Sequence, residues 1–129
     1  MTSPLTLAAG VDPDSPALAP LTAYAWGHAT GDPRHFRRAF LPTAHIEGIR
    51  DDGFVSWPLE EYAGLFSGSP APDEATRSRH LDSLDVVGTV AGATMTLRHG
   101  PNLFTDVFVL LLVDGGWRIA NKVYHRESV

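Results

Sequence analysis

The chain has 129 residues, of which 43% are hydrophobic, a formal net charge of -5 at pH 7 and no cysteine. This length suffices to bury the core of a globular domain, whereas the negative charge disfavours nucleic acid and anionic membranes as partners. The absence of cysteine excludes disulfides and thiol chemistry and is typical of a reducing compartment, so we expect a cytoplasmic protein.

The first part of the chain predicts an arm followed by a helix. Residues 1–15 carry prolines and small polar residues without a hydrophobic period, so we expect a flexible arm before a single domain over residues 16–129. From Leu18 to Ala29, apolar residues recur at helical spacing, and Gly31 is suited to end that helix.

Two more short helices are expected, one on each side of a hairpin. Residues 32–40 begin with an Asp-Pro pair, which is typical of a helix start, and then repeat apolar residues at helical spacing. Asp52-Gly53 separates two short extended runs and favours a tight hairpin turn. Residues 58–66 open on proline and place their apolar residues on one face, which predicts the third helix.

Four long strands are expected after these helices. Residues 77–87 and 90–99 are extended runs, and residues 104–125 form a hairpin with its turn at residues 114–116. Helices followed by strands predict an α+β fold, in which three N-terminal helices pack on one face of a curved antiparallel sheet.

The register of the last hairpin decides which of its residues face the helices. If Asp114-Gly115 is the central pair of a two-residue turn, Phe108 lies opposite Asn121 and both share a face with Asp106. The next glycine also permits a bulged three-residue turn, and a slip of one residue would exchange the two faces.

The opposite face of the same hairpin is also apolar. Its first strand carries Val107, Val109 and Leu111 there, with Arg118 and Lys122 expected across from them. Three short helices can cover only one face of the sheet, so we expect a second copy of the protein to cover the other, forming a homodimer.

A wider sequence pattern runs from about residue 18 to residue 126, and its most specific blocks are FTD at residues 104–106 and DGGWRIANKVY at residues 114–124. This pattern resembles the putative lumazine-binding (SnoaL-like) branch of the nuclear transport factor 2-like (NTF2-like) superfamily. The resemblance implies a cone-shaped, cystatin-like α+β fold, a small-molecule pocket between the helices and the concave sheet, and a homodimer through the outer sheet face. It implies no single activity, because the fold hosts isomerases, cyclases, dehydratases and binding modules.

Steroid isomerases of this superfamily offer a mechanistic comparison. Tyr24 resembles in its place the tyrosine with which those enzymes polarise a carbonyl group. Their base does not carry over, because Gly48 stands where the aspartate is expected and Glu47 points to the opposite face of the strand.

Asp106 is the best candidate for an acid or base. A carboxylate on the concave face of an apolar strand is partly desolvated, which tunes its pKa; the alternative is a carboxylate at the mouth of the sheet, solvated or paired with Lys122 or an arginine.

Tyr24 and His28 lie one turn apart on the first helix, so both can point into one cavity as catalytic helpers. Alternatively, the tyrosine is an ordinary core residue and the histidine merely favours a helix C-terminus.

Four further residues are candidates for ligand binding. Trp57 and Tyr62 suit a wall that stacks a flat ring, although ordinary packing is the favoured explanation. Phe108 shares the concave face, and Asn121 can orient a ligand carbonyl or satisfy a backbone group instead. The six histidines show no metal-ligand spacing, and phosphate-loop and dinucleotide motifs are absent, so neither a metal nor a cofactor is expected.

These patterns predict a protein that binds a small organic molecule in a half-apolar pocket. The first hypothesis is a cofactor-independent enzyme of the isomerase, cyclase or dehydratase type, which moves a proton with a carboxylate. The alternatives are a ligand carrier or a protein-interaction module on the same fold.

Overall fold

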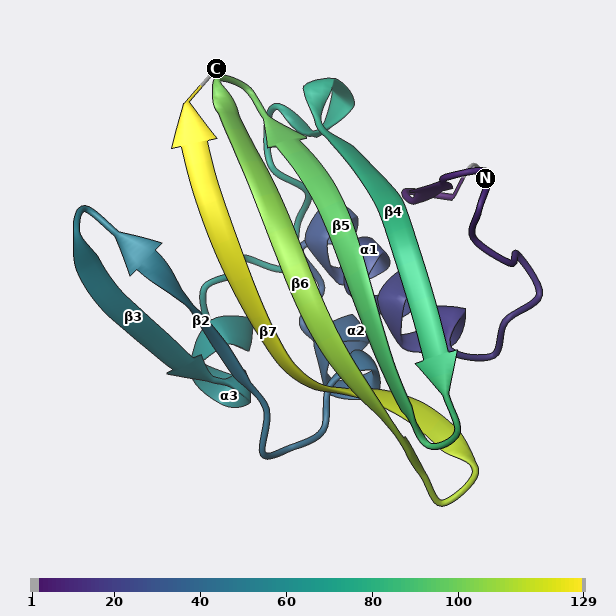
Figure 1. The fold of residues 1–129 in the computed structure, drawn as a ribbon. Helices are drawn as coiled ribbons and strands as arrows, with labels where there is room; N and C mark the ends of the chain where they lie inside the picture. The colour runs from purple at the N-terminus through teal and green to yellow at the C-terminus, as the bar shows by residue number, and fades with distance from the viewer. Residues whose placement is uncertain (1–2, 129) are drawn as a thin grey trace.

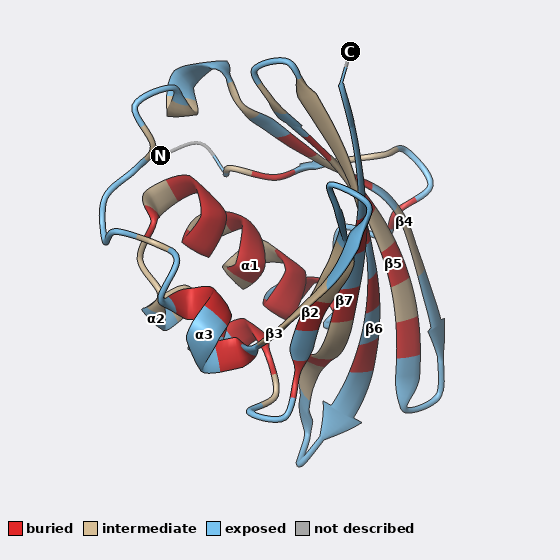
Figure 2. Cartoon of the chain, turned by 90° about the vertical axis from the view of Figure 1, so that its left-hand side faces the viewer, coloured by how far each residue is buried: buried red, intermediate tan, exposed pale blue. Residues whose placement is uncertain are grey.

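The computed structural model describes residues 3–128 and consists of a curved sheet with helices on one side (Figures 1 and 2). The helices are α1 (Leu18–Thr30), α2 (Arg34–Ala39) and α3 (Leu59–Ala63), with a 3-10 turn η1 (Glu74–Thr76). The strands are β1 (Thr6–Leu7), β2 (His45–Arg50), β3 (Gly53–Pro58), β4 (Ser78–Val87), β5 (Val90–His99), β6 (Asn102–Val113) and β7 (Gly116–Ser128). The expected α+β class is confirmed.

The strands follow the order β1-β4-β5-β6-β7-β2-β3. The four long strands pair antiparallel through successive hairpins, as expected, but β1 pairs parallel with β4 and β2 pairs parallel with β7. The prediction of an entirely antiparallel sheet is therefore wrong toward both edges. Strands joined by long connections are free to pair in either direction, and no hairpin links either parallel pair.

The helices cover the concave side of the sheet, with their buried faces turned toward it (Figure 2). The start of α2 is supported by Asp32, whose Oδ1 accepts a hydrogen bond from the Arg34 backbone N–H at 3.0 Å. Two of the helices precede the hairpin of β2 and β3, whereas α3 has only five residues and follows it.

The N-terminal segment is more ordered than the sequence pattern suggests. Thr6 pairs with His80 on β4, and the Ala8 N–H donates to the Leu81 carbonyl at 2.9 Å. Leu5 and Val11 are buried in the core. Two isolated apolar residues thus place part of the predicted arm, residues 1–15, against β4 and the core without forming a recognisable period; residues 1–2 of that arm lie outside the described residues.

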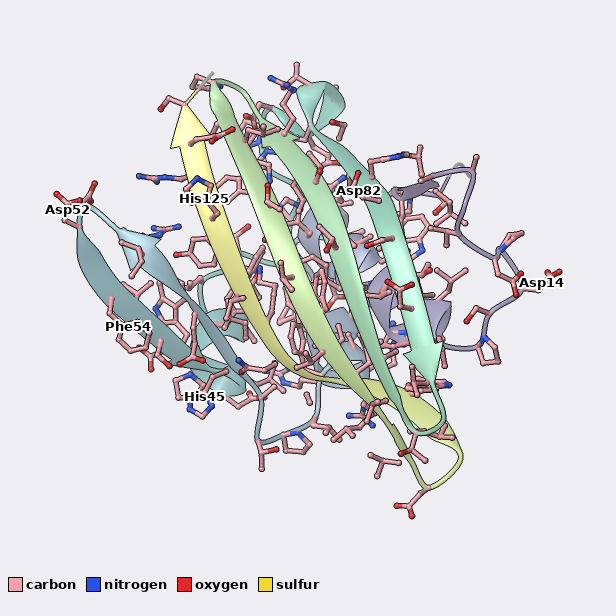
Figure 3. The ribbon with its side chains drawn as sticks, in the orientation of Figure 1. Asp14, His45, Asp52, Phe54, Asp82 and His125 are labelled. Carbon is pink, nitrogen blue, oxygen red and sulfur yellow. The ribbon has the colours of Figure 1, made fainter. Side chains whose placement is uncertain are left out.

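Two tight turns join strands through residues with positive φ angles. In the β6–β7 hairpin, Asp114 and Gly115 occupy the central positions with φ values of 51° and 81°, which confirms the expected turn. In the β2–β3 hairpin the central residues are Asp51 and Asp52, with φ values of 49° and 65°. This turn lies one residue earlier than expected, and Asp52 is at its tip (Figure 3). Aspartate tolerates this left-handed conformation better than most residues.

A β-bulge changes the register within the β6–β7 hairpin. Leu110 pairs with Ile119 as expected, but Val109 pairs with Asn121, so Ala120 is the extra residue. Beyond the bulge, Phe108 lies opposite Lys122 rather than Asn121, and Asp106 lies opposite Tyr124. Lys122 and Tyr124 are consequently buried on the concave side, whereas Val123 faces outward and is exposed.

The core fills the space between α1, α2 and the sheet. The largest fully buried side chains include those of Tyr24, Phe36, Phe40 and Phe108. The opposite sheet face remains open and apolar, with Val107, Val109 and Val123 exposed to 44%, 52% and 45%. Within residues 3–128, no helix combines the length and apolar character that crossing a membrane requires.

Candidate functional site

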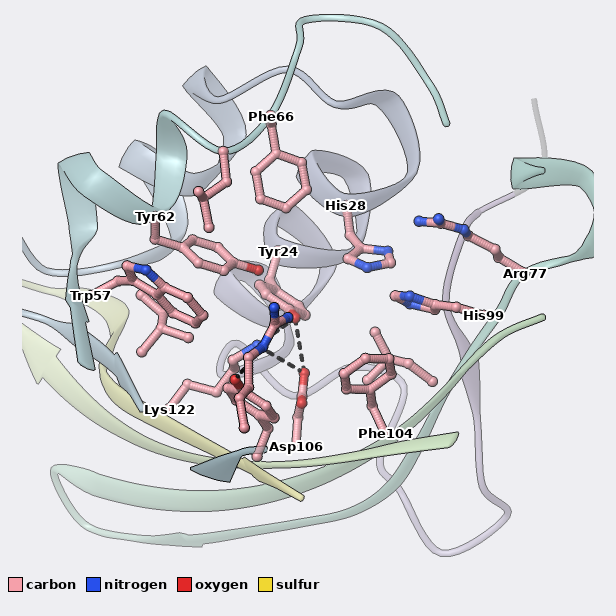
Figure 4. A pocket seen from close by; sticks show the side chains of 15 residues that line it. Tyr24, His28, Trp57, Tyr62, Phe66, Arg77, His99, Phe104, Asp106 and Lys122 are labelled. Carbon is pink, nitrogen blue, oxygen red and sulfur yellow. Dashed lines mark hydrogen bonds and ion pairs between the residues drawn. The ribbon is translucent and has the colours of Figure 1, made fainter. Parts of the chain in front are cut away.

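A cavity of about 380 Å³ lies between the helices and the concave face of the sheet (Figure 4). Of the residues singled out from the sequence, it brings together Tyr24, His28, Trp57, Tyr62 and Asp106. Helix α1, helix α3 and strands β3 and β6 contribute these side chains, so the cavity depends on the whole tertiary arrangement.

Tyr24, Asp106 and Lys122 form a buried hydrogen-bonded group at the base of this cavity, which we call the Tyr24–Asp106–Lys122 trio. The Tyr24 hydroxyl donates to Asp106 Oδ2 at 2.8 Å, and Lys122 Nζ donates to the Tyr24 hydroxyl at 2.8 Å and to Asp106 Oδ2 at 3.2 Å. Relative exposure is 1% for Tyr24 and Asp106 and 5% for Lys122. The hydrogen bonds from Tyr24 and Lys122 to Asp106 both end on Oδ2, so Oδ1 accepts neither of them.

The protonation of the trio follows from its burial and its charges. Burial and the negative charge of Asp106 raise the pKa of Tyr24 well above its ordinary value, so the phenol keeps its proton. Burial is the largest single effect on Lys122 and lowers its pKa, but the charge and hydrogen bond of Asp106 together with Tyr62 and Tyr124 outweigh it and leave that pKa raised. The trio therefore holds an ammonium group at neutral pH.

Aromatic rings surround this ammonium group. Lys122 Nζ lies 4.8 Å from the ring centroid of Tyr24, 5.3 Å from that of Tyr62 and 5.5 Å from that of Tyr124. Cations over aromatic faces are attracted by the ring quadrupole, which offsets part of the cost of burying the charge. This cage fixes the ammonium group at the base of the cavity.

His28 belongs to a separate network. Its Nδ1 accepts a hydrogen bond from Arg79 Nε at 2.8 Å, and the buried Arg79 side chain also bonds Glu74 through Nη1 at 3.0 Å. Burial and the Arg79 charge hold the pKa of His28 well below its ordinary value. The neutral ring thus carries its proton on Nε2. His28 was expected to assist Asp106. Its ring lies 6.2 Å from that of Tyr24, and among residues 3–128 its hydrogen bond is to Arg79 and not to a member of the trio.

Two other residues lie elsewhere than expected. Phe108 is fully buried behind Tyr24, with ring centroids 5.1 Å apart, and supports that tyrosine from the core. Asn121 accepts from the His45 N–H at 2.9 Å and donates to Glu47 Oε1 at 3.1 Å, so it ties β7 to β2. The bulge removes Asn121 from the cavity side, and its expected role toward a ligand is corrected.

The carboxylate in the cavity comes from Asp106 on β6, whereas the comparison with steroid isomerases places an aspartate at the position of Gly48 on β2. An ideal Cβ at this position would lie 2.6 Å from the Tyr124 ring, so a side chain there would require that ring to shift. Tyr124 itself accepts a hydrogen bond from Arg50 Nε at 3.0 Å. The aromatic ring occupies the space that a carboxylate on β2 would need.

Sequence reasoning missed several cavity residues. The bulge has no sequence signal, so the register expected from the sequence places Lys122 on the outer face, although an ion pair between Lys122 and Asp106 is among the sequence-based alternatives. His99, Arg77 and Arg50 also line the cavity. For His99 a signal existed, because strand alternation places it on the same face as Leu97. Among residues 3–128, no cluster of three histidine, cysteine or acidic side chains is arranged to hold a metal ion.

Solved structures with the same architecture include two proteins of unknown function. An NTF2-like protein from Shewanella baltica OS155 is 27% identical, with a TM-score of 0.78, covering 88% of this chain and 93% of that one. An NTF2-like protein from Methylobacillus flagellatus KT is 28% identical, also with a TM-score of 0.78, covering 94% and 98%. A cystatin-like fold protein from Burkholderia xenovorans LB400, 16% identical with a TM-score of 0.66 over 92% and 95% of the two chains, shares the fold.

Family comparison agrees with the structural similarity. None of the curated proteins matches this sequence. The model of the family described as "Putative lumazine-binding" matches residues 12–125, which is most of the chain. The chain therefore belongs to the putative lumazine-binding family of the NTF2-like superfamily.

Proposed function

We propose that the protein binds a small, flat organic molecule in this cavity and catalyses a cofactor-independent proton transfer on it. The observation that carries the proposal is the buried Tyr24–Asp106–Lys122 trio on the wall of a cavity of about 380 Å³. Ligand pockets of roughly 300–1,000 Å³ accommodate small organic molecules. Trp57 and Tyr62, with ring centroids 6.4 Å apart, supply an aromatic wall for such a ligand.

In the proposed reaction Asp106 is the base. Its Oδ1 takes a proton from a carbon next to a ligand carbonyl, and the electron pair of that C–H bond moves to the carbonyl oxygen to form an enolate. Lys122 uses two of its three N–H groups within the trio, and the third stabilises the enolate oxygen. Return of the proton to a different carbon completes an isomerisation without any cofactor, and Tyr24 positions the carboxylate throughout.

Ligand binding without catalysis is the second candidate. The hydrogen bonds of the trio close on one another, so the same ion pair also suits a rigid polar floor in a carrier protein. Proton exchange on a bound carbon acid distinguishes the two functions, because a carrier binds the molecule without accelerating exchange.

The flat ketone 2-tetralone in D₂O tests the proposed chemistry by proton NMR. We expect the protein to accelerate exchange of the protons next to the carbonyl above the buffer rate. Asp106→Asn should lower this acceleration by about 100-fold or more, with little change in affinity measured by intrinsic tryptophan fluorescence. Asp82→Asn is the matched control, because Asp82 bonds Thr96 at 2.7 Å at an exposed site outside the cavity lining.

The outcome also separates the two candidates. Binding of 2-tetralone without accelerated exchange by the wild-type protein would favour the carrier. Equal exchange by the wild-type protein and Asp106→Asn would remove Asp106 as the base. If Asp106→Asn fails to fold, Asp106→Asn combined with Lys122→Met, which leaves no buried charge unpaired, is compared with Lys122→Met alone, so that the difference reports on the carboxylate.

We further propose that the protein acts as a homodimer through the outer sheet face. Pairing places Val90 beside Leu111, and Val107 beside Val123, so their exposed side chains form one continuous patch with Val109. Contiguous apolar patches on a sheet are typical of interaction surfaces, and a twofold axis lets one patch cover its own copy.

A further inference from the structure

The cavity lining has more basic than acidic side chains, although the chain as a whole is acidic. The chain has a net charge of -5, yet the cavity lining contains Arg50, Arg77 and Lys122 against the single carboxylate of Asp106. That carboxylate is paired with Lys122 at 3.2 Å. The two guanidinium groups therefore have no carboxylate partner within the cavity lining, which favours an anionic ligand.

Arg77 is better placed than Arg50 to bind such a ligand. Arg50 lies 5.3 Å from the Trp57 ring centroid and donates to the Tyr124 hydroxyl, so its Nε and one of its faces are already occupied. Arg77 donates through Nε to Asp73 at 2.9 Å, which orients the guanidinium and leaves its two terminal nitrogens for the mouth of the cavity. The Arg77 side chain is 21% exposed and so is partly desolvated.

Two histidines stand beside Arg77 at the same end of the cavity. The rings of His28 and His99 are 4.5 Å apart, and Figure 4 shows both next to Arg77, across the cavity from Trp57. His99 Nε2 is buried and finds no hydrogen-bond partner among residues 3–128. A buried polar atom without a partner is costly, and a polar ligand group would remove that cost.

Both histidines are suited to donate a hydrogen bond without adding charge. Burial and the charges of Arg77 and Arg79 lower the pKa of His99 to about 4, and His28 is also neutral at pH 7. Arg79 occupies Nδ1 of His28, which places the proton of that ring on Nε2. Arg77 then supplies the positive charge, and the histidines supply additional polar contacts.

We propose that the ligand carries a carboxylate, bound at this end of the cavity by Arg77, His99 and His28. Its flat body then extends over the Tyr24–Asp106–Lys122 trio toward Trp57. A planar guanidinium fork matches a carboxylate, and one guanidinium that already faces Asp73 matches a single negative charge better than the double charge of a phosphate. This inference rests on the proposed ligand binding and is independent of the proposed proton transfer.

Two probes of equal shape and different charge test the carboxylate site. We expect 2-naphthoate to bind about 10- to 100-fold more tightly than 2-naphthamide, measured by titration calorimetry at low salt. Arg77→Gln should remove this preference by weakening naphthoate binding far more than naphthamide binding. Arg98→Gln is the matched control, because Arg98 is exposed on β5 next to His99 in sequence and does not line the cavity.

Histidine NMR gives a second readout that does not depend on affinity differences. A bound carboxylate stabilises the protonated imidazole, so 2-naphthoate should raise the pKa of His99 from about 4, whereas 2-naphthamide should not.

The remaining outcomes overturn the proposal. Equal affinity for the two probes, or no binding of either at about 10 mM, would contradict an anion site in the cavity. A preference for naphthoate that survives Arg77→Gln would place the carboxylate elsewhere, for example at Lys122. The naphthoate result does not depend on whether the protein accelerates proton exchange on 2-tetralone. Failure of the proposed carboxylate site and failure of the proposed proton transfer can therefore be told apart.

Discussion

At the scale of single residues, the buried ion pair of Asp106 and Lys122 dominates the site. Both groups are almost fully buried, and the shared hydrogen bonds of Tyr24 satisfy part of their polar capacity. A buried pair of this kind contributes little net stability compared with apolar residues, but removing one partner leaves an uncompensated charge. The pair therefore makes the cavity base sensitive to any change in either residue.

Lys122→Met should destabilise the protein by about 3–5 kcal/mol, because the Asp106 carboxylate would remain buried without its partner. The double variant Asp106→Asn/Lys122→Met should recover much of this loss. Urea denaturation of the wild type, both single variants and the double variant measures the coupling. Strictly additive effects of the two substitutions would contradict an energetic link between these residues.

At the scale of elements, the bulge in β7 and the close approach of β2 and β7 shape the cavity. The extra residue Ala120 turns Lys122 and Tyr124 inward, where Tyr124 then packs over Gly48 on β2. Bulges commonly re-aim side chains next to functional sites. The present packing favours glycine at this position, because the Cβ of any other residue would overlap the aromatic ring.

Gly48→Ala should lower the free energy of unfolding by about 1–3 kcal/mol, because the added methyl group overlaps the Tyr124 ring. Gly92→Ala on β5 is the control, since its added Cβ would come no closer than 4.0 Å to its nearest neighbour, the Phe108 carbonyl oxygen. Thermal and urea unfolding of both variants provide the measurement. Equal stability of the two variants would show that Tyr124 moves aside without cost.

At the scale of the whole molecule, one sheet presents two different apolar faces. The concave face is covered by the helices and encloses the cavity, whereas the outer face of β5, β6 and β7 is open (Figures 1 and 2). Because β6 is apolar on both faces, the proposed dimer would bury the outer face and account for a strand that does not alternate.

Leu111→Arg or Val109→Arg should convert the proposed homodimer into a monomer. A twofold axis would bury the new arginine of each copy in the interface, close to the same positive charge of the other copy. Ala75→Arg, at an exposed position in η1 outside that patch, should leave assembly unchanged. Sedimentation velocity measures the assembly state directly. A wild-type protein that sediments as a monomer at micromolar concentration would refute the proposed dimer.

Local patterns were enough to locate much of the fold and part of the site. Helix α1 followed from its spacing and its terminal glycine, and the turn at Asp114-Gly115 followed from its dipeptide. Alternation along β6 then placed Asp106 on the concave side. Each of these features depends on residues close together in the chain, so the local sequence pattern is enough to predict it.

Only the tertiary structure decided which charged groups meet in the cavity. The bulge at Ala120 reversed the faces of Asn121 and Lys122, and parallel pairing brought β2 against β7. His28 and Arg79 are 51 residues apart in sequence, and Tyr24 and Lys122 are 98 apart, yet both pairs are hydrogen-bonded. No local pattern encodes such contacts, because the balance between burying a charge and pairing it is settled only when distant segments pack together.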